Sequence, residues 1–174
     1  MRNRDPRSER THKLLVKAFT KKMLAPEEYD RISVTAICEA AGVARSTFYE
    51  HFRTKDEILA ASIRVPFTAL ARSVDNDVSS ADLEPMLHHV WENRRLGRSL
   101  FFGSTRRSVT RVLTSMIRAR LGSRKSSGDA DVLAVALAEA QLGTVAAWLH
   151  GDLICSASSI ATVIHAFSRV RFPR

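Results

Sequence analysis

Between positions 45 and 55 the chain groups hydrogen-bond donors and cations with almost no acid. These side chains are Arg45, Ser46, Thr47, Tyr49, His51 and Lys55. Residues of these types donate hydrogen bonds to phosphate oxygens and to the edges of base pairs. A guanidinium can also bind guanine O6 and N7 together, so Arg45 is the best candidate for a base contact. The chemistry that they suggest is recognition of a polyanion, and it needs elements that hold them on one face.

Two short helices around a tight turn are expected to position these side chains. The first carries its apolar residues at helical spacing: Val34, Ile37, Ala40 and Ala41. Ser33 precedes them where an N-cap accepts amide protons, and Gly42 follows where the chain needs a positive φ. A second helix begins near Ala44 or Arg45, with Phe48 and Phe52 as its buried face. This pattern predicts a helix-turn-helix, whose second helix lies in a DNA groove.

The stretch AICEAAGVARSTFYEHFRTKDEIL, from Ala36 to Leu59, resembles the DNA-binding motif of the tetracycline-repressor (TetR) family. The likeness covers about the first third of the chain. It implies that Thr35 contacts the DNA backbone and that the residues at 45–47 face the major groove. It also implies phosphate contacts for Tyr49, His51 and Lys55. Ala44 departs from the family pattern, in which a serine commonly caps the second helix.

An all-α fold is predicted, because no segment shows sustained strand alternation and about nine helices can be placed. The resemblance implies three N-terminal helices for DNA and a larger helical domain for ligand and dimerisation. We expect a DNA-binding domain over residues 1–53, with a flexible basic arm at 1–9, and a regulatory domain over 54–174. A capping-box pattern from Thr54 to Glu57 starts the fourth helix, and Pro66 should kink or shorten it.

Composition limits the classes of protein that fit. The chain has 174 residues, 45% of them apolar, which suits a globular protein with a proper core. No apolar run approaches the ~20 residues of a membrane span, and the N-terminus has no hydrophobic signal. Cys38 and Cys155 are expected to be buried, and no zinc-type spacing occurs. These observations predict a cytoplasmic protein without metal or cofactor and with no membrane partner.

The family resemblance implies a cavity in the C-terminal domain for a small-molecule effector, whose identity the sequence does not state. Candidate lining residues are Phe67, Met86, Val90, Trp91, Phe101, Phe102, Val112 and Met116. Ordinary core packing is the alternative for each of them, because methionine and aromatic side chains fill gaps in any helical domain.

The segment from Asp131 to His150 is apolar almost all round, so no face of this helix can be left to solvent. A homodimer interface formed with the last helix would bury its second face, and a fully buried place in the monomer core is the alternative. Candidate interface residues are Leu133, Leu137, Ala140, Thr144, Trp148, Ile160, Ile164 and Phe167.

Net charge is +9, and residues 93–128 contain ten basic residues and no acid. This block is a solvated face, a second set of phosphate contacts that includes Arg106, or a site for an anionic effector. The preferred function is a one-component regulator: a homodimer that binds a palindromic double-stranded operator, represses, and is released by a ligand. A non-specific or architectural nucleic-acid binder is the alternative. An enzyme is not expected, because no catalytic grouping has recognised spacing.

Overall fold

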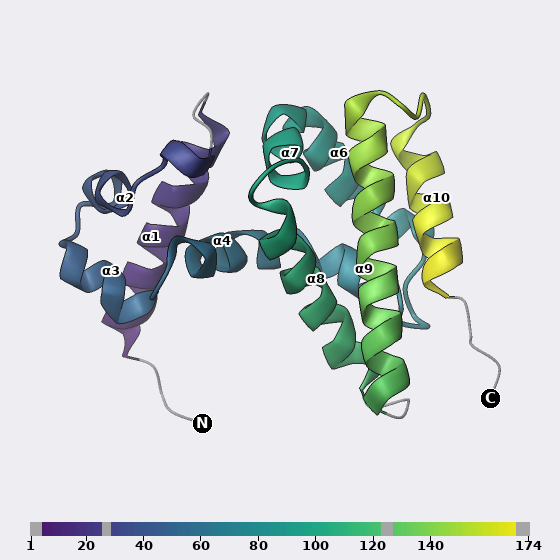
Figure 1. Cartoon of the computed structure of the whole chain (residues 1–174), viewed down its shortest axis with the longest axis horizontal. Helices are drawn as coiled ribbons and strands as arrows, with labels where there is room; N and C mark the ends of the chain where they lie inside the picture. Colours follow the sequence, from purple (N-terminus) through teal and green to yellow (C-terminus); the bar gives the residue numbers. More distant parts are fainter. Residues whose placement is uncertain (1–4, 26–28, 123–126, 170–174) are drawn as a thin grey trace. The chain divides into compact units, whose positions relative to one another are not determined.

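The computed structural model describes residues 5–25, 29–122 and 127–169. Within these ranges the chain is helical and has no strand, so the predicted all-α fold is confirmed (Figure 1). The α-helices are α1 (Pro6–Leu24), α2 (Val34–Ala41), α3 (Arg45–His51), α4 (Lys55–Arg64), α5 (Thr68–Arg72), α6 (Glu84–Glu92), α7 (Arg94–Phe101), α8 (Arg106–Leu121), α9 (Ser127–His150) and α10 (Ala157–Ser168). Two 3-10 helices, η1 (Tyr29–Arg31) and η2 (Ser80–Asp82), complete the described elements.

The chain divides into two compact units, Met1–Ile63 and Arg64–Arg174. The first unit therefore includes nearly all of α4, whereas the sequence analysis ended the DNA-binding domain at residue 53. Helix α4 begins at Lys55 as the capping pattern predicts: the Glu57 amide donates to Thr54 Oγ1 at 3.2 Å.

The core of the first unit joins α1 to the two helices of the motif. Leu15 and Phe19 of α1 are fully buried, as are Ile37 of α2 and Phe48 of α3. Burial of such side chains stabilises the unit by about 1.5–3 kcal/mol each. The neighbouring Leu14 is 42% exposed, because it lies about 100° around the helix from Leu15.

Helix α1 starts earlier than the sequence suggests. Asp5 is its N-cap and accepts the Arg7 amide at 3.0 Å, and Pro6 occupies the first turn, where a missing N–H costs nothing. Residues 5–9 therefore belong to a capped helix and its cap rather than to an arm. Residues 1–4 of the expected arm lie outside the described residues.

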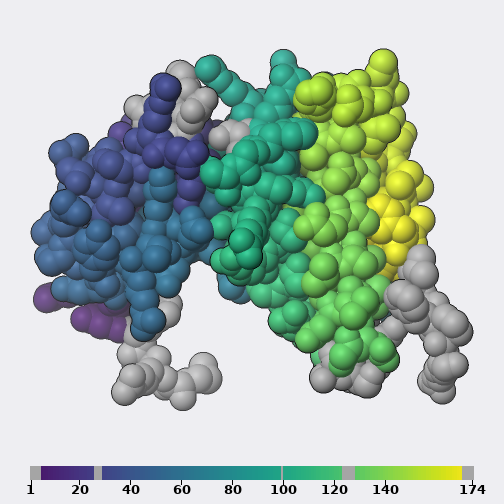
Figure 2. Space-filling view, in the orientation of Figure 1, coloured from purple at the N-terminus to yellow at the C-terminus, as the bar shows by residue number. Residues whose placement is uncertain are grey.

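In the second unit α8 and α9 form the principal antiparallel pair, and α10 lies along α9 (Figures 1 and 2). Helices α5 and α7 also pack on this pair, and α6 packs on α7 and α10. The core includes Leu113 and Ile117 of α8, Leu142 and Val145 of α9, and Ile164 of α10, all without solvent exposure.

Pro66 shortens α4, one of the two outcomes expected for it: the helix ends at Arg64, and the Thr68 amide donates to the Val65 carbonyl at 3.1 Å before α5 begins. This break gives ten α-helices in the described residues where about nine were expected. Helix α7 spans eight residues, and α9 begins at Ser127, four residues before the apolar segment that the sequence analysis starts at Asp131. Residues 123–126, which precede α9, are outside the described ranges.

One expectation about the cysteines is wrong. Cys155 is exposed in the α9–α10 connection, whereas Cys38 is buried as predicted. The stretch Gly128–His150 of α9 has the length and mean hydropathy, 1.6, of a membrane-crossing helix. The sequence analysis missed it because acids interrupt the apolar run. With 56% of that window buried inside the protein, and because core helices of soluble proteins meet the same criterion, this is weak evidence for a membrane span.

Candidate DNA-binding surface

Caps at both ends fix the length and direction of α2. The Ser33 hydroxyl accepts the Ala36 amide at 3.1 Å, and Gly42 ends the helix with φ of 67°. Both features are confirmed as predicted. Thr35 lies in the first turn of α2 with an exposed side chain, so no part of the protein that the structure describes prevents it from contacting a DNA backbone.

Helix α3 is held by one face and exposes the other. Phe48 and Phe52 are buried, with ring centroids 5.7 Å apart. Around the rest of the helix Arg45, Ser46, Tyr49 and Glu50 are exposed and Thr47 is half-buried. The first turn contains no acid. The two buried rings therefore orient a short helix whose leading turn presents donors.

No side-chain cap protects the start of α3. Ala44 has the extended backbone of an N-cap, with φ of −72° and ψ of 155°, but its methyl group accepts no hydrogen bond. The absence that the sequence predicted is confirmed. Nearby, burial raises the pKa of the Cys38 thiol, and the positive charge of Arg45 acts in the opposite direction.

Tyr49 and His51 differ in how freely they could reach a phosphate. Tyr49 is 51% exposed and rests edge-on against Phe48, with centroids 5.4 Å apart. His51 is half-buried and meets the ring of His12 on α1, with centroids 6.0 Å apart. His51 therefore packs α3 against α1, and its phosphate contact stays a prediction.

Lys55 is engaged inside the unit. Its Nζ donates to the Tyr29 carbonyl at 2.7 Å, lies 3.4 Å from the Asp30 carbonyl, and sits 4.1 Å from the centroid of the Tyr29 ring. Burial lowers the pKa of this lysine, while the charges of Asp30 and Asp56 raise it. The cation expected to meet phosphate is thus partly withdrawn from solvent.

Arg53, which the sequence analysis did not single out, lies between α3 and α4 with an exposed side chain. Its amide donates to Glu57 Oε2 at 2.7 Å, so its backbone is fixed. In the part of the chain that the structure describes, its guanidinium forms no ion pair. A cation directly after the buried Phe52 was the signal that could have identified it.

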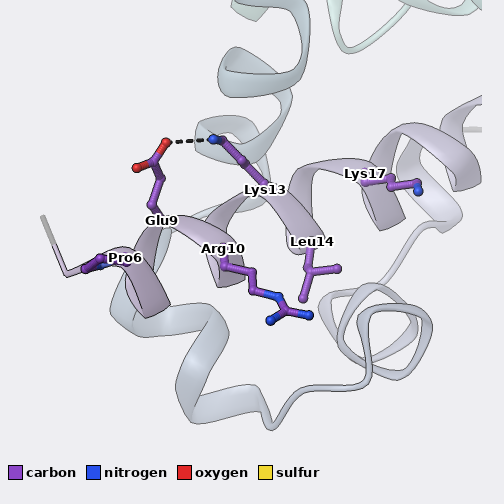
Figure 3. Close-up of a pocket in the computed structure, with 6 residues that line it drawn as sticks. All are labelled: Pro6, Glu9, Arg10, Lys13, Leu14 and Lys17. Atoms are coloured by element: carbon purple, nitrogen blue, oxygen red, sulfur yellow. Dashed lines mark ion pairs between the residues drawn. The ribbon is translucent and has the colours of Figure 1, made fainter.

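A shallow hollow of about 360 Å³ runs along the outer face of α1 (Figure 3). Its lining residues are Pro6, Glu9, Arg10, Lys13, Leu14 and Lys17. Figure 3 shows Arg10 and Leu14 on one side of the helix and the Glu9–Lys13 ion pair, at 2.7 Å, on another. One helix supplies the whole lining, so the hollow is part of a basic surface and not an enclosed effector cavity.

Several arginines of the acid-free block find acids or carbonyl groups elsewhere in the second unit. Arg106 pairs with Glu139 and Arg118 with Asp131, each at 2.6 Å, and Arg120 pairs with Asp75. Arg98 Nε donates to the Leu149 carbonyl at 2.8 Å, while Arg95, Arg107 and Arg111 are exposed. The block is therefore acid-free in sequence but partly neutralised in space.

The residues proposed to line an effector cavity separate into two groups. Phe67, Met86, Phe101 and Val112 are buried, and Val90 and Met116 are half-buried. Trp91 and Phe102 are 42% and 44% exposed, so they lie at the surface of the unit. The rings of Phe67 and Phe101 stack almost parallel, with centroids 6.3 Å apart.

One polar cluster crosses the apolar interior of the second unit. The fully buried Gln141 donates to Ser73 Oγ and Ser168 Oγ, each at 2.9 Å, and so joins α9 to the end of α5 and to α10. Gln141 Oε1 is buried without a partner in the described residues. The buried polar residues that the structure describes in this unit are uncharged: Ser73, Thr105, Ser108, Thr114, Gln141 and Ser168.

Most of the candidate interface residues pack inside a single chain. Leu133, Leu137, Trp148, Ile160 and Ile164 are buried in the core of their own unit, which is the alternative that the sequence left open. Ala140 is exposed, and Thr144 and Phe167 are half-buried. The sequence analysis missed the exposed apolar face of these helices, which includes Val132, Val135, Ala136, Gly143, Val163 and Ala166.

Among the described residues, no group of three or more histidine, cysteine, aspartate or glutamate side chains could hold a metal ion. His150 and Asp152 contact each other at 3.1 Å at the exposed end of α9.

Comparison with known proteins places the motif in a family. The sequence model described as "Bacterial regulatory proteins, tetR family" matches residues 19–62. The uncharacterized HTH-type transcriptional regulator YxbF of Bacillus subtilis (strain 168) is 33% identical over 60 residues. These residues are 34% of this chain and only 16% of that relative's length.

Solved structures extend the likeness to the whole fold. A TetR transcriptional regulator from Streptococcus agalactiae 2603V superposes with a TM-score of 0.60 at 21% identity, over 95% of this chain and 97% of that one. FadR of Thermus thermophilus, a TetR-family repressor solved with lauroyl-CoA, gives 0.56 at 14% identity, over 93% and 97%. At these identities the comparison shows a shared fold.

Proposed function

In its N-terminal unit the chain belongs to the bacterial regulatory proteins of the tetR family, and on that premise we propose that it is a sequence-specific transcriptional repressor. It binds a palindromic double-stranded operator as a homodimer, and a small molecule releases it. The proposal includes a cytoplasmic location and no enzymatic activity.

The observation that carries this proposal is the division of α3 into two faces. Phe48 and Phe52 anchor the helix, while Arg45 and Ser46 are exposed in a leading turn without acids. Arg45 contacts a base edge, and Thr35 and Tyr49 contact the phosphate backbone. Phosphate contacts supply most of the affinity, whereas the base contacts choose the sequence.

Dimerisation is proposed through the exposed faces of α9 and α10. Val132 and Val163 are 70% and 53% exposed, and Ala140 and Gly143 lie on the outer side of α9. Small residues let two helices approach closely, and an apolar patch that extends over exposed helix faces marks a protein–protein interaction site. A dimer carries two copies of α3, which would read half-sites about 34–36 Å apart.

Effector binding is proposed for the interior of the second unit. Support comes from the fold, which this chain shares with the FadR repressor solved with lauroyl-CoA. Phe67, Met86, Phe101 and Val112 would line the site, and Gln141 Oε1 would accept a hydrogen bond from the ligand. Because a ligand donor would satisfy this buried acceptor, effectors with a hydroxyl or amide N–H should bind more tightly than those without one.

Selection of bound duplexes from a random-sequence pool tests the proposed function. The expected result is an enriched inverted repeat with half-sites about one helical turn apart. Equal affinity for selected and random duplexes, across a range of salt, would instead establish the non-specific binder that the net charge of +9 also favours.

A further inference from the structure

We propose that Lys55 is a positioning residue, which holds the start of α2 in place through η1, and that Arg53 is the cation that meets phosphate at the α3–α4 junction. This inference rests on the proposed function in DNA binding. It reverses the expectation that the lysine at the start of α4 contacts DNA.

The contacts of Lys55 leave little of its ammonium group for a phosphate. An ammonium has three N–H donors. One donates to the Tyr29 carbonyl at 2.7 Å, the Asp30 carbonyl lies at 3.4 Å, and the face of the Tyr29 ring covers the group at 4.1 Å. A phosphate contact would have to replace these interactions.

The next residue strengthens the same connection. The Tyr29 hydroxyl donates to Asp56 Oδ1 at 2.5 Å, and the Tyr29 ring is buried against Phe19 of α1. The first two residues of α4 therefore hold both the backbone and the side chain of Tyr29. Three helical elements, α1, η1 and α4, meet at this one ring.

The connection reaches the proposed DNA contacts through a short path. Tyr29 O also accepts the Ile32 amide at 3.1 Å, and the next residue, Ser33, is the N-cap of α2. Thr35 lies in the first turn of that helix. Loss of the Lys55 contacts should therefore loosen the position from which α2 approaches the DNA backbone.

Arg53 has the properties that Lys55 lacks. Its side chain is exposed, and the bond from its amide to Glu57 Oε2, at 2.7 Å, holds its backbone at the end of α3. The charge is placed by a fixed backbone and is free to pair with a phosphate oxygen.

Salt titration of DNA affinity separates the two cations. The probe is a 30-bp duplex of random sequence, and the variants of the full chain are Arg53→Gln and Lys55→Met. We expect Arg53→Gln to reduce the slope of log affinity against log salt by about one, since one phosphate contact is lost. Lys55→Met should leave the slope unchanged while affinity for this duplex falls about tenfold.

Hydrogen exchange without DNA provides the second readout. In Lys55→Met the amides of Ile32 and Ala36 should exchange faster, whereas amides of α8 in the other unit, such as that of Leu113, should not change. Lys55→Arg, which keeps charge and donors, should restore the protection, and Arg53→Gln should not alter it. If Lys55→Met does not fold, Lys55→Gln is measured in its place.

A smaller salt slope in the Lys55 variant overturns the positioning role, whatever the exchange data show. Unchanged exchange at Ile32 and Ala36 overturns it as well. An unchanged slope in Arg53→Gln overturns the role of Arg53. If the wild-type chain binds no duplex, the proposed function fails, and the exchange data still decide whether Lys55 holds η1.

Discussion

Trp91 of α6 stacks on Trp148 of α9, with ring centroids 4.7 Å apart and ring planes 26° from parallel. These are the two tryptophans of the chain, so its indole fluorescence and its indole circular dichroism report on this one contact. The Arg94 guanidinium lies over the Trp91 ring, 5.7 Å from its centroid.

The two tryptophans should differ in their contribution to stability. Trp91→Phe removes part of a half-exposed stack and should cost about 1 kcal/mol. Trp148→Phe also removes the donor to the Cys155 carbonyl, at 3.0 Å, and should cost about 1–3 kcal/mol more. Urea unfolding of both variants measures the difference; equal losses would show that this hydrogen bond contributes nothing.

Arg45→Ala should reduce base discrimination rather than abolish DNA binding. A bidentate contact with guanine discriminates by about 1–3 kcal/mol. The ratio of affinities for the selected operator and a point-mutated operator measures it. Arg111→Ala, which removes an exposed arginine from α8, is the control for net charge. An unchanged ratio in Arg45→Ala would place the reading face elsewhere on the unit.

Substitutions at the N-caps of α2 and α3 should change the stability of the protein in opposite directions. Ser33→Ala removes the acceptor of the Ala36 amide and should destabilise the protein by about 1 kcal/mol. Ala44→Ser installs an acceptor where the backbone already has N-cap geometry, and should stabilise it by a similar amount. Chemical denaturation tests both, and a destabilised Ala44→Ser variant would argue against the assigned cap position.

Stability should fall at high pH because of Tyr29. Burial and the hydrogen bond to Asp56 raise the pKa of this phenol in the folded protein. A group with a raised folded pKa contributes its full stability below its unfolded pKa, about 10, and loses it as pH rises toward the folded value. In Tyr49→Phe, where Tyr29 is the remaining tyrosine, phenolate absorbance should appear only together with loss of helical circular dichroism.

Asp56→Asn is the comparison for that titration. It removes the acceptor carboxylate and should allow Tyr29 to ionise at a lower pH. If Tyr29 ionised with the usual tyrosine pKa, about 10, while the helices of the Tyr49→Phe variant remained intact, the buried position of the ring would be contradicted.

Val163→Asp should prevent dimerisation if α10 forms the interface. A carboxylate in an apolar interface is costly unless it is paired. Val65→Asp is the matched control, because Val65 is also an exposed valine, at 80%, but lies between α4 and α5. Sedimentation velocity should show a monomer for the first variant and a dimer for the second. Two dimeric variants would exclude this face.

The local features of the motif could be predicted from the sequence alone. The Ser33 cap, the positive φ of Gly42, the buried Phe48 and the missing cap at Ala44 depend on residues within a few positions of one another. Short-range hydrogen bonding and helical periodicity decide such features, so the helix-turn-helix and the all-α fold followed directly.

Tertiary structure decided which partner each remaining residue has. From the sequence, Lys55 is predicted to be a free cation at a helix start. In the structure, two carbonyl groups of η1, some 25 residues earlier, lie beside the Lys55 ammonium group. From the sequence, Trp148 and Ile164 are candidate interface residues. The packing of α9 and α10 places both in the core, and it leaves Val132 and Val163 exposed. Periodicity states that a helix has an apolar face, but the direction of that face is set by contacts between segments far apart in the sequence.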